Sequence, residues 1–251
     1  GGGDGGAASA APAAPAAAET QGAEMGAEMG AAIAGAANSP AIVRLLGLDG
    51  RVKWHSNGRR GMDDKKLFLV SPGTDEHKTV LSTFARTMPH VEVDSIERVE
   101  NGQQHEAFSL HRCQVAQAFA PGAAQGGVTR LLFHGTSEDS LQSIIHGSGF
   151  QVTLSGSRIG NLNGVGVYFA RDAAYSHQFA CVLQTGQRQM LAAEVVVGRW
   201  TRGSAGMRQC PLLPGEHFKR FNSLVDNEAD PSVYVVQNSS QAYPAYLITY
   251  H

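Results

Sequence analysis

The stretch Gly-Val-Tyr-Phe-Ala-Arg-Asp-Ala-Ala-Tyr-Ser, residues 166–176, is the most specific part of this 251-residue chain. Its first four residues form a short apolar run that predicts a β-strand. A helix is expected to follow from about Asp172. Taken singly, Tyr168 is typical of a buried core tyrosine, and Ser176 is typical of a helical serine that bonds to its own backbone. The functional meaning of the stretch therefore depends on the motifs around it.

Short strands and helices are expected on both sides of this stretch. An apolar run at 67–70 ends at a Pro-Gly turn, and Thr74 then caps a helix that ends at Pro89. The other expected elements are extended chain at 91–99, helical spacing over 108–119, a strand at 131–133, a helix from 137 to Gly147 or Gly149, and strands at 190–197, 233–236 and 246–250. Residues 201–230 form a long polar connection with little regular pattern. The mixture predicts an α+β domain with mixed sheets, because a doubly wound fold would alternate strands and helices regularly.

Residues 156–166, Gly-Ser-Arg-Ile-Gly-Asn-Leu-Asn-Gly-Val-Gly, invite comparison with a dinucleotide-binding loop. A Rossmann loop is rejected, because a strand follows where a helix should begin. Two interpretations stay open, a flexible lid over a ligand and a plain surface loop.

His134, Gly135 and Thr136 come directly after the expected strand at 131–133. A histidine at a strand end is more often structural than functional. Gly135 favours the functional interpretation, because a residue without a side chain lets a ligand approach the backbone closely.

The first 40 residues consist mostly of Ala and Gly, with several Pro and an imperfect Gly-Ala-Glu-Met repeat. They lack the large side chains that would offset the entropy cost of ordering. Residues 1–40 are therefore predicted to be a disordered linker, with an Ala-rich helix as the alternative for short stretches. The folded domain is expected over 41–251, as one domain of a larger protein.

The formal net charge is −2, from 20 Lys and Arg against 22 Asp and Glu. Four of those acids lie in the first 40 residues, so the rest of the chain carries 20 bases and 18 acids. A body so close to neutral argues against a broad electrostatic grip on nucleic acid or on an anionic membrane. No apolar run approaches the roughly 18–20 residues that span a bilayer.

The three cysteines, Cys113, Cys181 and Cys210, are far apart and odd in number. Because no Cys-x-x-Cys pair exists and the histidines lack ligand-like spacing, neither a disulfide framework nor a metal site is predicted. This usage fits a reducing, intracellular location, cytoplasmic or nuclear. An N-terminal region without Lys or Arg argues against a secretory signal or a transit peptide.

Four blocks of the sequence resemble, in family order, the catalytic domain of the poly(ADP-ribose) polymerases, and most closely its mono-ADP-ribosylating branch. The blocks are residues 132–136, 166–176, 231–236 and 241–250, and the likeness covers residues 65–251. The resemblance implies an ADP-ribosyltransferase-like fold, in which two mixed or antiparallel sheets form a split sandwich with flanking helices. It also implies that NAD+ is the substrate, cleaved between nicotinamide and ribose, and that a protein side chain accepts the ADP-ribose.

The same resemblance assigns the residues of the site. Gly135 would hold the nicotinamide carboxamide through its backbone N–H and C=O, with the Ser176 hydroxyl as a third partner. Tyr168 would stack on the nicotinamide and its ribose, and His134 would hydrogen-bond the adenosine ribose. Residues 151–163 would form a donor loop over the NAD+. The residues expected to contact NAD+ are His134, Gly135, Thr136, Tyr168, Phe169, Ala170, Ser176 and Phe179.

The chain departs from the family pattern in three places. Val233 stands where polymer-forming members have a glutamate that stabilises the developing cation and activates the hydroxyl of a growing chain. The catalytic set His134, Tyr168 and Val233 is therefore expected to transfer a single unit. Phe179 replaces a tyrosine and keeps its stacking surface. Gln103-Gln104-His105 replaces a Leu-Trp pair, which should change the local packing and leave the site intact.

A protein mono-ADP-ribosyltransferase is the leading hypothesis, on the retained His134 and Tyr168 and the aliphatic Val233. The alternative is a catalytically inactive module of the same fold that binds NAD+ or ADP-ribose, or another protein. A relative acting on nucleic-acid phosphates is disfavoured, because the body is nearly neutral and basic clusters beyond Arg59-Arg60 are missing from the sequence.

Overall fold

The computed structural model describes residues 66–119, 128–152 and 161–251, together with Gly1. The linker expected at 1–40 and the domain boundary expected at residue 41 lie outside these residues. The helices are α3 (Asp75–Ala85), α4 (Gly102–Gln117), α5 (Glu138–His146) and α6 (Ala173–His177), with the 3-10 helices η2 (Asn161–Asn163) and η3 (Ser239–Gln241). The strands are β1 (Leu67–Leu69), β2 (Val93–Val99), β3 (Thr129–His134), β4 (Val167–Ala170), β5 (Cys181–Val182), β6 (Arg188–Val196), β7 (Trp200–Arg202), β8 (Ser223–Val225), β9 (Val233–Val236) and β10 (Ala242–Tyr250).

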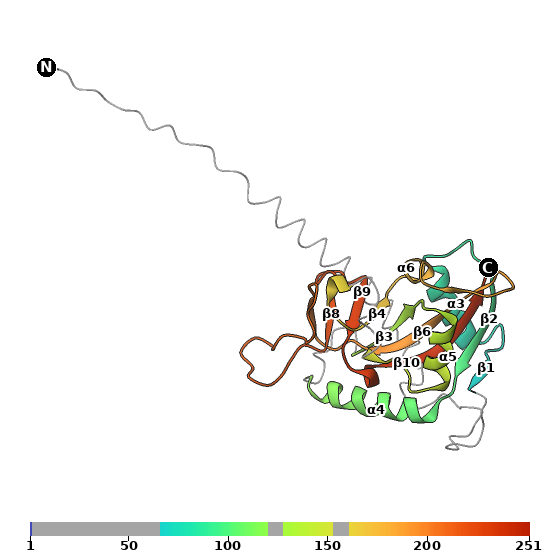
Figure 1. Cartoon of the computed structure of the whole chain (residues 1–251), viewed down its shortest axis with the longest axis horizontal. Helices are drawn as coiled ribbons and strands as arrows, with labels where there is room; N and C mark the ends of the chain where they lie inside the picture. Colours follow the sequence, from blue (N-terminus) through green and yellow to red (C-terminus); the bar gives the residue numbers. More distant parts are fainter. Residues whose placement is uncertain (2–65, 120–127, 153–160) are drawn as a thin grey trace.

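The described strands join one mixed sheet in the order β1-β2-β10-β6-β3-β4-β9-β8-β7, and β5 pairs with β6 (Figure 1). Only β7 and β8 run parallel among these pairings. The α+β prediction is confirmed, although the strands follow one continuous hydrogen-bonded path where two sheets were expected. The two parts of this sheet are joined only weakly, because β3 and β4 share a single registered pair, Phe133 with Ala170. Only the last residues of these two strands overlap there.

Local sequence signals explain where the elements begin and bend. The Thr74 hydroxyl accepts a hydrogen bond from the His77 N–H at 3.2 Å and caps α3 as predicted. Pro244 lies inside β10, where the register with β6 shifts between Pro244 and Tyr246. Proline has no N–H for the ladder, so it is accommodated at such an irregularity. The connection expected at 201–230, with little regular pattern, contains the end of β7 and the whole of β8. Both strands have three residues and are too short to show a periodic pattern.

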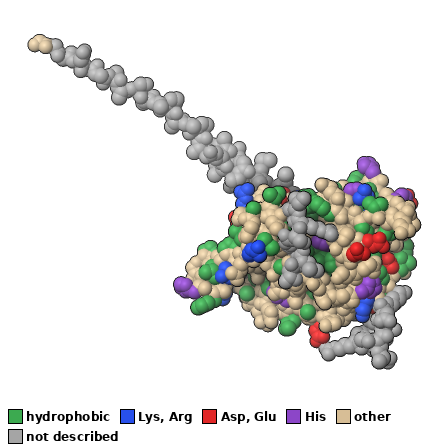
Figure 2. All heavy atoms as spheres, viewed as in Figure 1, with side chains coloured by type: hydrophobic (Ala, Val, Ile, Leu, Met, Phe, Trp, Pro, Cys, Tyr) green, Lys and Arg blue, Asp and Glu red, His purple; other side chains and the backbone are tan. Residues whose placement is uncertain are grey.

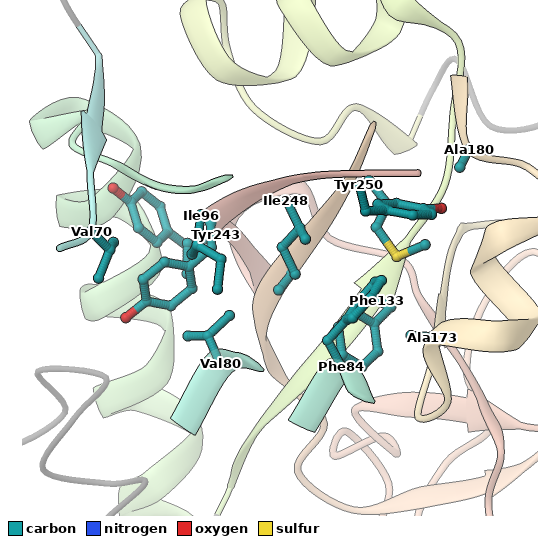
Figure 3. Close-up of a cluster of buried hydrophobic side chains, with 14 of the residues drawn as sticks. Val70, Val80, Phe84, Ile96, Phe133, Ala173, Ala180, Tyr243, Ile248 and Tyr250 are labelled. Carbon is teal, nitrogen blue, oxygen red and sulfur yellow. The ribbon is translucent and has the colours of Figure 1, made fainter. Parts of the chain in front are cut away.

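Two hydrophobic clusters cover the opposite faces of the sheet. The first contains Val80 and Phe84 of α3 and Phe108 and Val115 of α4. Figure 3 shows Phe84 of this cluster against Phe133, with Tyr250 close by; the ring centroids are 6.1 and 5.1 Å from that of Phe84. The second cluster contains Leu141, Ile144 and Ile145 of α5.

Strand alternation assigns each residue of β3 to one of these faces. Phe133 belongs to the first cluster and Leu132 to the second. Because successive side chains of a strand point to opposite faces, His134 shares the face of Leu132. The strand thus delivers an imidazole to the α5 side of the sheet, next to the junction with β4.

The surface agrees with the nearly neutral charge of the body. On the face shown in Figure 2, Lys and Arg side chains are scattered and form no continuous basic patch over the described residues. No helix in the described parts of the chain is long and apolar enough to cross a bilayer.

Glu194 is a carboxylic acid buried in the middle of the sheet. It lies on β6 opposite Leu131 and Tyr243, and only 3% of its surface is exposed. Burial raises the pKa of Glu194 to about 8, and the positive charge of Arg112 on α4 opposes this effect. Its Oε2 atom has no hydrogen-bond partner among the described residues. The side chain is therefore held mainly in its neutral form near pH 7.

Glu194→Gln should flatten the pH dependence of stability. In the wild type the folded state retains a proton that the unfolded carboxyl releases above about pH 4.3. Its contribution to stability is therefore complete below that pH and is lost as pH rises through about 8. Between pH 5 and pH 8.5 the wild-type melting temperature should fall, relative to that of the variant, by at least about 3 °C, the shift that about 1 kcal/mol produces in a domain of this size. Equal pH dependence of the two proteins in calorimetry would contradict a raised pKa.

Candidate functional site

His134 ends β3 and is oriented by a backbone atom of the neighbouring strand. Its Nδ1 lies 2.8 Å from the carbonyl oxygen of Tyr168 on β4. Because a carbonyl oxygen only accepts hydrogen bonds, Nδ1 carries the hydrogen and the Nε2 of the neutral ring is an acceptor. The rings of Phe150 and Phe169 pack against the imidazole, with centroids 5.3 and 5.4 Å away. This packing fixes the direction in which Nε2 points.

The surroundings of His134 also favour the neutral ring. Burial lowers the pKa of His134, and the hydrogen bond to Tyr168 opposes that shift without reversing it. The imidazole is therefore an uncharged acceptor, suited to a hydroxyl donor and unsuited to an anionic group.

Gly135 follows His134 and touches the backbone of α6. A Cβ atom at this position would lie 2.1 Å from the carbonyl oxygen of Ser176 and 2.8 Å from the nitrogen of Ala180. Real Cβ atoms do not approach other atoms so closely, so the contact requires glycine. The end of β3 can therefore lie directly against the end of α6.

This contact brings together three polar groups without partners. Within the described residues, neither the N–H nor the C=O of Gly135 makes a backbone hydrogen bond, and no side-chain hydrogen bond of Ser176 is found. Ser176 as a residue is 3% exposed, and its hydroxyl is not among the fully buried unpaired atoms of the described residues, so it retains access to a ligand. One backbone donor, one backbone acceptor and a hydroxyl match the N–H and C=O groups of a primary carboxamide.

Tyr168 of β4 is half-buried, and its hydroxyl is fixed by the chain just before the strand. The hydroxyl donates to the Gly164 carbonyl at 2.6 Å and accepts from the Asn163 N–H at 3.1 Å. Burial raises the pKa of Tyr168, so the phenol stays neutral and remains a donor. These two hydrogen bonds hold the Tyr168 ring in one orientation.

Two exposed aromatic rings flank the same region. Phe179 is 55% exposed and Tyr175 is 44% exposed, and their ring centroids are 5.8 Å apart. The amide of Phe179 donates to the Ser176 carbonyl at 3.0 Å, so the ring follows directly on the Gly135 contact. Tyr175 was missed from the expected site residues. Its proximity to Tyr168, with which it interacts electrostatically, could not be read from sequence spacing.

Val233 begins β9 opposite Ala170 and is 4% exposed. Its N–H donates to the Asp226 Oδ1 at 3.0 Å. That carboxylate also accepts from the N–H and the hydroxyl of Ser232. Burial raises the pKa of Asp226, but these hydrogen bonds outweigh it and lower the pKa overall. The carboxylate therefore stays charged and stabilises the loop between β8 and β9.

The other expected site residues are less exposed or only partly described. Phe169 and Ala170 are each 1% exposed, and Phe169 packs on Phe150 with ring centroids 4.9 Å apart. Thr136 is half-buried and follows the Gly135 contact. Of the donor loop expected at 151–163, residues 153–160 lie outside the described residues.

At Gln103-Gln104-His105, where the sequence differs from the family pattern, Gln104 makes hydrogen bonds that stabilise the segment leading to the site. The Gln104 amide donates to the carbonyls of Ile144 and Gly147, both at 2.8 Å. Asn101 donates to the Ile145 carbonyl at 3.1 Å. These bonds satisfy carbonyls at the C-terminus of α5, which helix geometry leaves unpaired. They fix the chain that leads to Phe150, and Phe150 packs on His134.

The described residues contain no cluster of three or more His, Cys, Asp or Glu side chains that could hold a metal ion. All three cysteines are free, with Cys113 exposed and Cys181 and Cys210 buried.

Comparison with known proteins gives one family. The model of the poly(ADP-ribose) polymerase catalytic domain matches residues 74–207, just over half of the chain. Mouse protein mono-ADP-ribosyltransferase PARP12 is 35% identical over 188 residues, which cover 74% of this chain and 25% of that protein. Human PARP12 is 34% identical, covering 78% and 27%, and mouse protein mono-ADP-ribosyltransferase PARP11 is 31% identical, covering 74% and 60%. The chain thus spans about a quarter of PARP12 and three-fifths of PARP11. The resemblance inferred from the four sequence blocks is confirmed.

Two variants at the contact between Gly135 and Ser176 should distinguish its effect on packing from the effect of the serine hydroxyl. Gly135→Ala forces a Cβ into the Ser176 carbonyl and should lower the melting temperature by at least about 3 °C, since overpacking costs about 1–3 kcal/mol. Ser176→Ala removes a hydroxyl without a described partner and should leave the melting temperature close to that of the wild type. A Gly135→Ala protein as stable as the wild type would show that β3 and α6 do not touch in this way.

Proposed function

This chain belongs to the poly(ADP-ribose) polymerase catalytic-domain family, and we propose that it is an NAD+-dependent protein mono-ADP-ribosyltransferase. The observation that carries the proposal is the set of unpaired polar groups at Gly135 and Ser176. The Gly135 N–H donates to the carboxamide oxygen of nicotinamide, and the Gly135 carbonyl accepts from its NH2. The Ser176 hydroxyl supplies the third bond. Hydrogen bonds in a buried site discriminate strongly, because a mismatched ligand leaves a polar group unpaired.

The adjacent residues hold the rest of the dinucleotide. The Nε2 of His134 accepts a hydrogen bond from a hydroxyl of the adenosine ribose, since its Nδ1 is occupied by the Tyr168 carbonyl. Tyr168 and Phe179 present aromatic faces to the nicotinamide. An aromatic face beside a desolvated cation contributes on the order of 1–2 kcal/mol. NAD+ is thus held at both ends and exposes the bond between nicotinamide and ribose.

NAD+ supplies a leaving group, because nicotinamide departs as a neutral molecule. The electron pair of the broken C–N bond neutralises the positively charged ring nitrogen, and positive charge develops on the ribose as in glycoside cleavage. The acceptor atom forms a bond to the same ribose carbon and releases its proton where it carries one. The chain holds and orients both ends of the substrate; no nucleophile of its own is needed.

Val233 limits the reaction to one transfer. A carboxylate at this position would activate a ribose hydroxyl as the next acceptor, and a buried aliphatic side chain cannot remove a proton. The Asp226 carboxylate, which accepts from the N–H of Val233, is held by hydrogen bonds to the segment that carries Val233. The product is therefore a protein carrying single ADP-ribose units. The proposed acceptor is a protein side chain, and the free cysteines support an intracellular location.

Intact mass spectrometry after incubation with NAD+ tests this function. The wild-type chain should gain single ADP-ribose increments on itself or on an added protein. His134→Ala and Tyr168→Ala should lower the yield at least about tenfold, because each loses a contact worth about 1.4 kcal/mol or more. His146→Ala, on the exposed surface of α5, is the matched control and should transfer like the wild type.

Each other outcome of that experiment has a distinct meaning. A long ladder of increments would contradict the role given to Val233. NAD+ binding in calorimetry without any adduct would favour the catalytically inactive module. Full activity of both site variants would show that the reaction takes place elsewhere on the chain.

The pH dependence of NAD+ binding tests the protonation state of His134. Burial lowers the pKa of this ring, so the acceptor is lost only when pH falls below the ordinary histidine range. Affinity should therefore fall between pH 7.5 and 6.0 by less than it would for a histidine whose pKa is not shifted. A histidine with an ordinary pKa near 6.5 would lose about fourfold, in proportion to its neutral fraction. A fourfold loss in the wild type, absent from the non-titrating His134→Gln, would show that the pKa is not lowered.

A further inference from the structure

A side-chain amide joins two backbone segments beside Tyr168. Gln237 follows β9, and its Nε2 donates to the carbonyl of Val165 at 2.9 Å and to that of Met207 at 3.1 Å. The N–H of Val165 donates in turn to the same Met207 carbonyl at 2.8 Å. We call Gln237, Val165 and Met207 the clamp. One amide NH2 has two hydrogens, so a single glutamine can satisfy both carbonyls.

The clamp adjoins the atoms that hold the Tyr168 hydroxyl. That hydroxyl is bonded to Asn163 and Gly164, which immediately precede Val165. β4 begins at Val167 and pairs there with Val236, the residue before Gln237. A shift of the chain at Val165 therefore moves both anchors of the phenol, although Gln237 itself makes no described contact with Tyr168.

The two clamped segments are in direct backbone contact. A Cβ at Gly203 would lie 2.0 Å from the Asn163 carbonyl oxygen. A Cβ at Gly164, whose φ is +107°, would lie 3.0 Å from the Met207 carbonyl oxygen. The connection between β7 and β8 thus contacts the loop that anchors Tyr168. In Figure 1 this connection is drawn in orange and projects from the body of the domain. Within the described residues, Gln237 is the side chain that bonds to both segments.

We propose that Gln237 is a positioning residue for the reaction. By holding Val165 and Met207 together it fixes the loop that orients Tyr168, and it thereby sets the affinity for the nicotinamide end of NAD+. The proposal rests on the function proposed above. It adds a residue outside the four family blocks that defined the site, and it predicts that Gln237 acts only through the Tyr168 hydroxyl.

A double-mutant cycle on the full chain tests this route. Gln237→Leu replaces the amide by an apolar group of similar size. The Val165 carbonyl then loses its Gln237 donor, and the Met207 carbonyl keeps only the N–H of Val165. The substitution should lower kcat/KM for NAD+ about tenfold, the effect of losing roughly one well-placed hydrogen bond. Most of the change should be in KM, with kcat within about threefold, because ligand binding is what the stacked ring provides. Tyr168→Phe should lower kcat/KM to a similar extent.

The combination of the two variants decides between positioning and general destabilisation. Once the phenol hydroxyl is gone, Gln237→Leu should change kcat/KM by less than about threefold, since coupled residues are not additive. A combined loss equal to the product of the two single losses would overturn the proposal. Gln189→Leu is the matched control, because Gln189 bonds Thr249 at 3.1 Å on the other half of the sheet. It should leave kcat/KM at the wild-type value.

A second variant reaches the same loop from the opposite side. Gly203→Ala pushes the Asn163 carbonyl and should reproduce the rise in KM without touching Gln237. Unchanged KM in both Gln237→Leu and Gly203→Ala would overturn the proposal. Calorimetric NAD+ binding by the wild type is measured alongside. If the wild type neither binds nor turns over NAD+, the proposed function is wrong. This result differs from unchanged KM in the variants of an active wild type, which would contradict only the role of Gln237.

Discussion

The close contact between the end of β3 and the end of α6 is the constraint on which the site depends. It exists because Gly135 has no side chain; a Cβ there would lie 2.1 Å from the Ser176 carbonyl. The contact places Gly135, whose backbone N–H and C=O make no backbone hydrogen bond within the described residues, against the backbone of the buried Ser176. It lies at the junction where β3 and β4 share one registered pair. The shortest strand pairing along the sheet therefore lies beside the backbone groups that we propose to bind the carboxamide.

The two rings of the site are oriented mainly by backbone atoms. The Tyr168 carbonyl sets the tautomer of His134, and Asn163 and Gly164 set the direction of the Tyr168 phenol. Backbone partners do not change when side chains are substituted, so the orientation depends on how the segments pack. The packing in turn depends on Phe150, Gly203 and Gln237, which lie in segments far apart along the chain. Geometry at the site is thus an outcome of the whole sheet and its connections.

Sequence predicted the elements with strong local signals and missed those fixed by distant contacts. The Thr74 cap and the apolar face of α3 are local, so that helix was predicted correctly. β8 was missed because three residues are too few to show an alternating pattern, and because its pairing with β9 depends on tertiary contacts. The blocks around His134 and Tyr168 indicated a site through their resemblance to a family. Gln237 lies outside the four blocks and carries no comparable signal. Tyr175 lies inside one of them, but its approach to Tyr168 appears only after folding. The exchange at Gln104 shows the reverse case: a departure from the family pattern turns out to cap α5.

The most direct test of the account is the amide resonance of Gly135 during titration with nicotinamide. The account predicts that this resonance shifts downfield on binding, because its N–H gains a carboxamide acceptor. Nicotinic acid is the comparison ligand: its carboxylate has no N–H for the Gly135 carbonyl, so it should bind weakly and leave the resonance nearly unmoved. If nicotinamide binds with the Gly135 amide unchanged, or if the two ligands behave alike, the carboxamide is not held where the structure places its partners.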